Sequence, residues 1–214
     1  MASEVDICNI ALSHLGDNAT IASINPPEGS VQAEHCQRFY PIARDTLLEM
    51  HSWNFATKRI RLNSITESGA YTNPTEWDYV YQLPADCNTV IGVLPKGASD
   101  DYSENGAGEY STQKYQLEVI STGEKVIRSD TKDAELRYVA WVTDTTKFSS
   151  LFTMALTWNL ASLLAGAVIK GDVGSAEGKR CAQMMATWLG EARSADAKQR
   201  NIKPNHIVGW ISGR

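Results

Sequence analysis

The stretch LFTMALTWNLASLLAGAVIK, residues 151–170, decides the fold, because it is a helix-length segment without a charged face. No charged residue occurs from Phe148 to Ile169. A helix on a protein surface normally has one apolar and one charged face. Leaving an apolar face in water costs about 25 cal/mol per Å². This segment must therefore be covered on more than one side.

Three kinds of cover are open to this segment: a membrane, its own chain, or its own chain together with a second copy. Its length would cross a hydrocarbon layer. Six Ser, Thr or Asn side chains lie between Phe148 and Ile169, one side lacks a basic flank, and every other segment reads as soluble, which argues against a membrane. The three other helices expected below have one modest stripe each. We therefore expect Trp158 or the alanine-rich face to be covered by another copy, which favours self-association over a monomeric core helix.

Composition places the 214-residue chain among ordinary globular proteins, with 43% hydrophobic and 21% charged residues. The net charge of -5 argues against wrapping of nucleic acid phosphates. The four cysteines form no C-x-x-C pair, so zinc and redox motifs are not expected and buried free thiols are. The start MASEVD has no basic or apolar region, and we expect no secretory signal.

Two amphipathic helices are predicted near the start of the chain, at 3–16 and 30–51. Ser3 and Asp6 form an S-x-x-D start signal. Pro41 should kink the second helix or split it in two. A last helix is expected after a break at GDVGS, residues 171–175. Its apolar stripe is Cys181, Met184, Trp188 and Ala192.

The middle of the chain alternates apolar and polar residues, which predicts short strands. They are expected at 77–83, 88–94, 115–119, 125–128 and 135–142. Helices, then strands, then helices indicate an α+β protein. We expect a long solvated loop at 96–109, rich in acidic residues and glycine and mobile in the free chain. The end, 201–214, is too short for a core and unusually apolar.

No catalytic or ligand-binding motif stands out. The four histidines are scattered, and H-E-x-x-H, G-x-S-x-G, Walker and G-x-G-x-x-G patterns are missing. We therefore expect no enzyme activity, no metal and no cofactor. The alternative is a cell-wall hydrolase, which would need a carboxylate pair in a cleft. Glu34, Asp45 and Asp86 are the residues whose mutation would test it.

Several pieces of sequence resemble, in the same order, the tail tubular protein A family, the head-to-tail adaptors of short-tailed phages. The pieces are YPIARDTLLEMHSWNFATKRIRL at 40–62, WDYVYQLPADCNTVIGV at 77–93, ICNIALSHLG at 7–16 and FSSLFTMALTWNLASLLAGAV at 148–168. The resemblance as a whole covers roughly residues 4 to 200. Within them the matching motifs are Arg44-Asp45, Trp53-Asn54 followed by Phe55-Ala56, Arg59, and Y-x-L-P-x-D-C at 81–87. No single motif is diagnostic, and the order of these four carries the resemblance.

The resemblance implies an α-helical core, residues 1–56 and 143–200, with a small antiparallel β domain, 57–142, inserted between the second and third helices. It implies a homododecameric ring that joins the portal protein after genome packaging and retains the DNA. The ring would pass double-stranded DNA on to a nozzle protein of the tail tubular protein B type. The chain would be made in the host cytoplasm and lie in the virion tail, without a membrane partner.

Residue roles follow from this resemblance and from residue chemistry. The 201–214 segment is expected to dock on the portal through four apolar side chains, Ile207, Val208, Trp210 and Ile211. Subunit contacts are expected at Arg44, Asp45, Arg59, Arg61 and Trp158. The 96–109 loop would dock the next tail component. A small helical regulator or membrane-attached binding module is a third class that the sequence leaves open.

Overall fold

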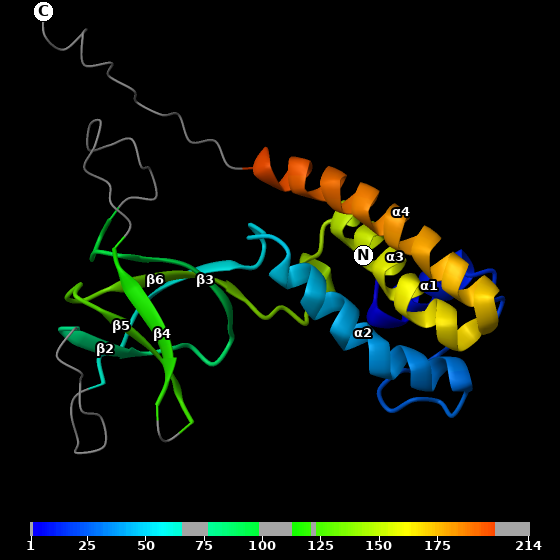
Figure 1. Cartoon of the computed structure of the whole chain (residues 1–214), viewed down its shortest axis with the longest axis horizontal. Coiled ribbons are helices and arrows are strands. Elements are labelled where there is room, and N and C mark those ends of the chain that lie inside the picture. The colour runs from blue at the N-terminus through cyan, green and yellow to red at the C-terminus, as the bar shows by residue number, and fades with distance from the viewer. Residues whose placement is uncertain (1, 66–76, 99–112, 121–122, 200–214) are drawn as a thin grey trace, which may run out of the picture. The chain divides into compact units, whose positions relative to one another are not determined.

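The computed structural model describes residues 2–65, 77–98, 113–120 and 123–199. The chain divides into two units (Figure 1). Residues up to Ala56 and from Trp141 to Gln199 form a helical unit, and residues from Thr57 to Ala140 form a β unit. Helices and antiparallel sheets are both present, so the α+β class expected from the sequence is confirmed.

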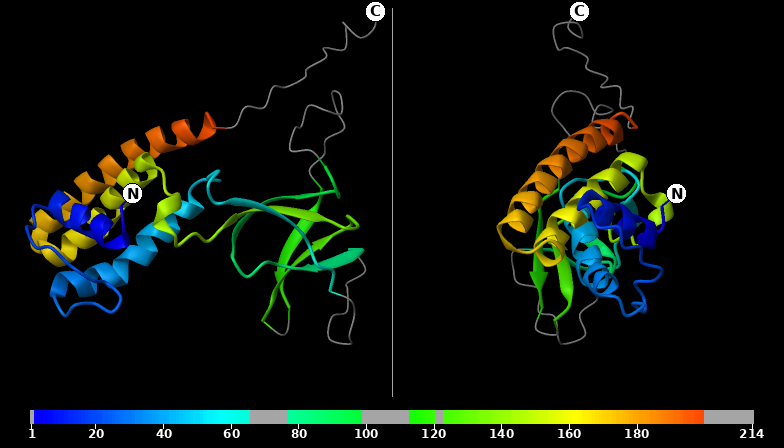
Figure 2. Two further views of the ribbon diagram at one scale, coloured as in Figure 1. Left: turned by 180° about the vertical axis from the view of Figure 1, so that it is seen from behind. Right: turned by 90° about the vertical axis from the view of Figure 1, so that its right-hand side faces the viewer.

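The helical unit has α3 at its centre, in contact with each of the other three helices (Figure 2). The described elements are α1 (Glu4–His14), α2 (Val31–Glu49), the 3-10 turn η1 (Thr145–Lys147), α3 (Ser150–Val168) and α4 (Gly171–Ala197). The first two helices precede the β unit in sequence and the last two follow it. Both halves of the chain are therefore needed to complete this core.

The ends of α1 are fixed by local hydrogen bonds that its sequence predicts. The side chain of Ser3 accepts from the backbone of Asp6, whose carboxylate accepts from the backbone of Ser3, which is a capping box. At the other end Gly16 has φ 75°, a conformation that glycine adopts without strain. There the Asp17 N–H donates to the Leu12 carbonyl, completing a Schellman motif.

α3 is covered within its own unit, which corrects the expectation that three helices cannot cover it. Phe152, Leu156 and Leu160 are fully buried, and Trp158 is 9% exposed. Among the described residues α3 is the one helix long and apolar enough to suit a membrane span, yet 56% of its most apolar window is buried. Leu163, 37% exposed, is the large apolar side chain that α3 leaves most open. The apolar composition of α3 is therefore that of a core helix.

α2 is one helix that includes Pro41, so of the two outcomes expected there the split does not occur and the kink stays a prediction. Proline lacks the N–H that would donate one turn back, and a helix tolerates this loss when packing compensates. Tyr40 and Ala43 on either side of Pro41 are buried, and the Ala43 carbonyl accepts a bond from Asn159 of α3 at 3.0 Å. Tertiary packing therefore holds α2 in one piece.

The expected break between the two helices is present but lies at Lys170 and Gly171, and α4 already begins at Gly171, so Asp172 to Ser175 are helical. The glycines there serve close packing of α4 on α3. A Cβ on Gly174 would lie 2.9 Å from the carbonyl oxygen of Ala165, and one on Gly178 would lie 3.3 Å from that of Ser162. The chain reverses between the two helices at Lys170 and Gly171, both with positive φ.

Replacing Gly174 by alanine is expected to destabilise the helical unit, because the new methyl group meets backbone that cannot move aside cheaply. Gly190, also in α4, has open space around its Cα, so Gly190→Ala should be neutral or stabilise by up to about 1 kcal/mol through helix propensity. Thermal unfolding followed by circular dichroism compares the two variants. Equal midpoints for both would contradict close α3–α4 packing.

Within the described residues, the β unit has two three-stranded antiparallel sheets. One has the order β1 (Thr57–Arg61), β6 (Glu135–Ala140), β3 (Cys87–Leu94), and the other has β2 (Tyr79–Gln82), β5 (Lys125–Ser129), β4 (Tyr115–Val119). Tyr81, Ile127 and Leu136 lie in the core of this unit. Five of these strands overlap the predicted ones, and β1 was not predicted.

Candidate functional site

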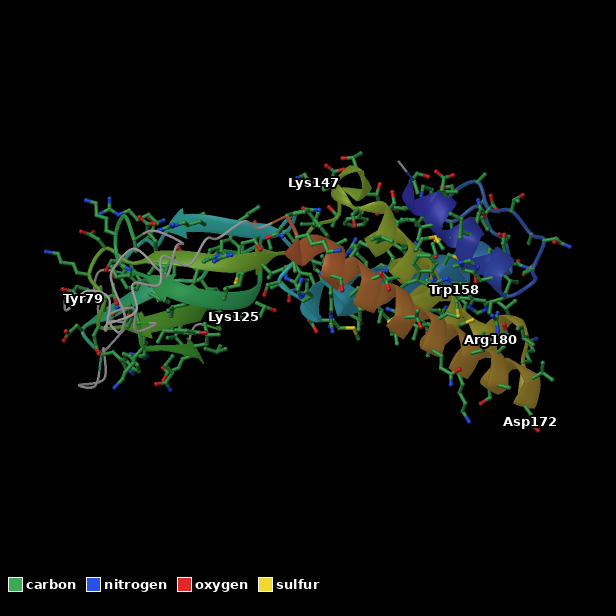
Figure 3. All side chains as sticks on the ribbon, turned by 90° about the horizontal axis from the view of Figure 1, so that it is seen from above. Tyr79, Lys125, Lys147, Trp158, Asp172 and Arg180 are labelled. Atoms are coloured by element: carbon green, nitrogen blue, oxygen red, sulfur yellow. The ribbon has the colours of Figure 1, made fainter. Side chains whose placement is uncertain are left out.

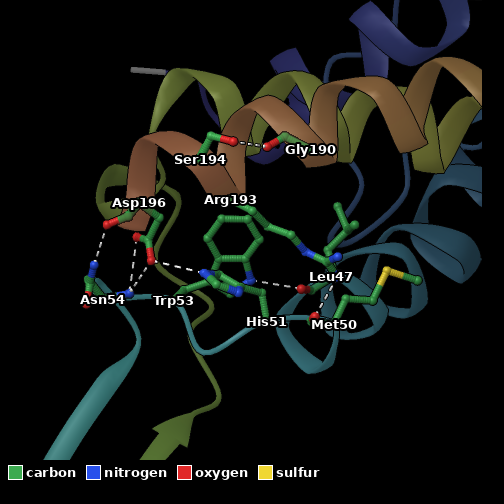
Figure 4. Close-up of polar contacts among 9 residues, drawn as sticks. All are labelled: Leu47, Met50, His51, Trp53, Asn54, Gly190, Arg193, Ser194 and Asp196. Atoms are coloured by element: carbon green, nitrogen blue, oxygen red, sulfur yellow. Dashed lines mark hydrogen bonds and ion pairs between the residues drawn. The ribbon is translucent and has the colours of Figure 1, made fainter. Parts of the chain in front are cut away.

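A cluster at the C-terminal end of α4 is the best-organised polar site of the helical unit (Figure 4). Its centre is the carboxylate of Asp196, a residue only 6% exposed. The backbone N–H of Asn54 lies 3.2 Å from each carboxylate oxygen. His51 Nε2 lies 3.2 Å from Oδ2. A buried carboxylate is stable only with such partners. We call Asp196, His51 and Asn54 the α4 clamp.

Three further hydrogen bonds brace the α4 clamp. Asn54 Nδ2 donates to the Asp196 carbonyl at 2.7 Å. Arg193 Nη2 donates to the Met50 carbonyl at 2.6 Å. The indole of Trp53, 1% exposed, donates to the Leu47 carbonyl at 2.8 Å. The end of α4 is thus bonded to the segment that leaves α2.

The position of the α4 clamp in the chain gives it a mechanical role. Asn54 precedes by two residues the boundary between Ala56 and Thr57, where the β unit starts. Asp196 precedes by three residues Gln199, after which the C-terminal segment begins. The α4 clamp therefore bonds the segment just before the β unit, at Asn54, to the end of α4, at Asp196.

A second cluster surrounds Trp158 on α3 (Figure 3 shows Trp158 with Arg180). The His14 ring stacks on the indole with centroids 3.6 Å apart and planes 6° apart. The Arg180 guanidinium lies 5.4 Å from the indole centroid and donates to the His14 carbonyl at 3.2 Å. Glu177 pairs with Arg180. The chain itself thus covers Trp158, and the reason for expecting a second copy there is removed.

Burial, and then the charge of Arg180, lower the pKa of His14 below its ordinary value of 6.5. The unfolded chain therefore binds this proton at higher pH than the folded chain does. Stability should be fully present above pH 6.5 and should fall as pH drops below it. Urea unfolding of the chain and of His14→Gln at pH 7.5 and pH 5 checks this, since the variant should lose less stability. Equal losses would contradict it.

The charged residues predicted for subunit contacts have partners within the chain. Arg44 Nε lies 2.7 Å from Asp45 on α2. In the β unit Arg59 Nε lies 2.7 Å from Glu135, and Arg61 pairs with Asp133. These pairs join β1 to neighbouring segments of its own unit. A role between subunits would require exchange of these partners, and it stays a prediction.

Two of the carboxylates named for a hydrolase, Glu34 and Asp45, do not form a pair. Glu34 and Asp45 lie eleven residues apart on α2, about 16 Å along the helix. Paired glycosidase carboxyls lie within about 9.5 Å. Asp86 belongs to the β unit, where Lys58 and the Tyr138 hydroxyl bind it and lower its pKa. A depressed pKa suits an ion-pair partner and not a general acid at neutral pH.

Other predictions fall on residues outside the described ones. Ile207, Val208, Trp210 and Ile211 all do, as does most of the 96–109 loop. Within the described ranges, no group of three His, Cys, Asp or Glu side chains is placed to hold a metal ion. All four cysteines, Cys8, Cys36, Cys87 and Cys181, are free and buried, as expected.

Neither a family model nor a curated protein matches the chain. The site must therefore be interpreted from its own geometry and from the sequence resemblance above.

Sequence reasoning missed the α4 clamp, although a signal was present. Continuing the stripe of Trp188 and Ala192 by four residues reaches Asp196, which marks a carboxylate on a buried face. It also missed His14 and Arg180 as the cover of Trp158. Their convergence depends on helix packing, which spacing along the chain does not reveal.

Proposed function

We propose that the chain is a structural head-to-tail connector of a phage tail. Copies form a ring, of twelve by the resemblance, beneath the portal protein. The ring extends the DNA channel, retains packaged DNA and joins the portal to a nozzle protein. The protein belongs in the virion tail and performs no catalysis.

One observation carries the proposal: the core of the helical unit is assembled from both halves of the chain and is interrupted by the β unit between α2 and α3. This is the organisation that the resemblance to tail tubular protein A implies, and it supports the proposal. A helical unit joined through the chain to a β unit suits a part with several structural neighbours.

The charge of the chain supports a conduit and not a DNA-gripping protein. The net charge is -5. The basic side chains of β1 are paired with carboxylates, namely Lys58 with Asp86 and Arg59 with Glu135. Phosphate binding would have to displace those partners. A channel wall of the same sign as DNA keeps the duplex sliding.

The contacts of the ring follow from what the helical unit leaves exposed. Trp158 is already covered, so we place the apolar part of the subunit contact on other side chains of the helical unit. Val31, Ile42 and Val173 are 64%, 53% and 69% exposed. Arg44 and Asp45 lie on α2, which also carries Ile42, and would join that contact.

Coexpression with the portal protein of the same phage tests the proposal. We expect the chain to copurify with the portal as a stoichiometric ring, with mass measured by light scattering. A monomer without portal leaves the proposal standing, since a connector can assemble only on its portal. Cell-wall cleavage by the purified chain without portal binding would contradict it and favour the hydrolase alternative.

A further inference from the structure

The strand β4 has a free edge with unpaired backbone groups, within the part of the chain that the structure describes. β4 pairs only with β5. The Ile120 N–H donates to the Glu124 carbonyl. Residues of an antiparallel pair alternate between bonding to the partner and pointing away. Tyr115, Leu117 and Val119 therefore direct their N–H and C=O groups away from β5.

The hydrogen bonds of β5 agree with this assignment of which β4 residues point away from it. The Lys125 carbonyl, opposite Val119, accepts from the Leu83 N–H on the β2 side at 3.2 Å. It is therefore turned away from β4, as the alternation requires. Three consecutive alternate residues of β4 offer a regular bonding edge.

Apolar side chains of β4 point toward the core side of their sheet but are not covered. Leu117 is opposite Ile127, which is fully buried, so both lie on the same face. Leu117 is nevertheless 48% exposed and Val119 is 65% exposed. The only charged side chain of β4, Glu118, faces the other way and binds Arg128. This face thus lacks the cover that a further strand would give.

A groove of about 390 Å³ runs between β4 and β3. Its apolar lining includes Leu83, Val90, Leu117 and Val119, and the charged residues Glu118 and Lys125 also border it. Asn88 also lines it, and its Nδ2 is buried without an acceptor. A buried donor without a partner is destabilising. The groove thus suits an apolar strand with a free carbonyl.

The other sheet edges in the described ranges are blocked. Residues 63–65 bond to β2, through Ile65 N–H to Val80 and Gln82 N–H to Asn63. β1 carries Lys58, Arg59 and Arg61, and charges of this kind protect an edge. β3 has two register shifts. β4 is the regular edge without such protection.

We propose that the edge of β4 binds the chain's own C-terminal segment, residues 207–211, as an added strand. Every Val, Ile or Leu outside the described residues lies in the C-terminal segment 200–214. The other sizeable candidates, 66–76 and 99–112, contain none, and 99–112 is acidic. Alternate side chains of the added strand fill the groove, and its backbone satisfies β4 and Asn88.

The inference rests on the proposed function in one respect: these are the residues assigned to portal contact. One segment cannot occupy both places. The edge of β4 therefore holds the segment in a subunit that is not on the portal, and the portal takes it over. This keeps Trp210 and its apolar neighbours out of water before assembly.

Hydrogen exchange of the isolated full-length chain tests the inference without the portal. We expect the amides of Tyr115, Leu117 and Val119 to exchange slowly. In the double variant Val208→Asp and Trp210→Asp they should exchange at least about tenfold faster, while Gln116 and Glu118, which bond to β5, should change little. Unprotected amides in the natural chain, or protection that persists in the variant because something else occupies the edge, would overturn the inference.

A matched pair of surface variants locates the effect. Val119 and Val173 are 65% and 69% exposed, one on β4 and one on α4. Val119→Lys should speed exchange at Leu117 as the tail variant does, and Val173→Lys should not. If both or neither do so, the edge of β4 is not the binding site. Portal capture is measured separately, so its result does not depend on this one.

Discussion

Asp196→Ala will lower the thermal midpoint of the helical unit by roughly 6–12 °C, because it removes the centre of the α4 clamp. Asp196 is 6% exposed and accepts from Asn54 and His51. Hydrogen bonds to a charged group contribute about 1.5–3 kcal/mol, and the partly buried Asn54 N–H would lose its partner. We expect a loss of about 3 kcal/mol in urea unfolding.

Two companion variants give this result its meaning. Asp196→Asn keeps an acceptor for the Asn54 N–H but loses the charge. Its thermal midpoint should therefore lie between those of the natural chain and Asp196→Ala. Glu191→Ala, at an exposed acidic residue of the same helix, should shift the midpoint by no more than about 2 °C. If Asp196→Ala has the same thermal midpoint as Glu191→Ala, the α4 clamp does not hold α4 to residues 51–54.

Deletion of residues 202–214 will abolish copurification with the portal protein. The segment contains four apolar side chains, Ile207, Val208, Trp210 and Ile211, and tryptophan is often a binding hot spot. A buried tryptophan anchor lost to alanine costs at least about 2 kcal/mol, so Trp210→Ala should weaken capture roughly 30-fold. Pull-down with immobilised portal measures both.

The control for the C-terminal segment is Ser212→Ala, next to the apolar residues but without an anchor. It should bind like the natural chain. Circular dichroism must show the deletion variant folded, since all four described helices end before residue 200. Full capture by the folded deletion variant would show that the portal contact lies elsewhere on the chain.

The fold class could be predicted because hydrophobic spacing changes twice along the chain. Tyr115, Leu117 and Val119 alternate as a strand does, and α3 has helical length and composition. β1 was missed because TKRIR shows no apolar alternation. Its charges are satisfied by Asp86, Glu135 and Asp133, which sequence spacing does not bring near. Tertiary pairing, not local preference, makes this segment a strand.

The site was harder to predict than the fold. Asp196 resembles a solvated helix charge until its partners are known, and Asn54 lies 142 residues away. Gly174 resembles a helix break until α3 is placed 2.9 Å from where its Cβ would be. In both cases the local residue type suggests exposure or disruption, and long-range packing reverses that meaning. Only the three-dimensional contacts distinguish an exposed or helix-breaking residue from one that packs in the core.

The central claim is that copies of this chain form a closed ring between portal and nozzle. Electron cryomicroscopy of the assembled tail tests it most directly. The account predicts a ring of this chain under the portal, with the helical units side by side around the DNA channel and the C-terminal segments against portal subunits. A tail in which the chain lies outside the channel axis, or in single copies, would contradict it.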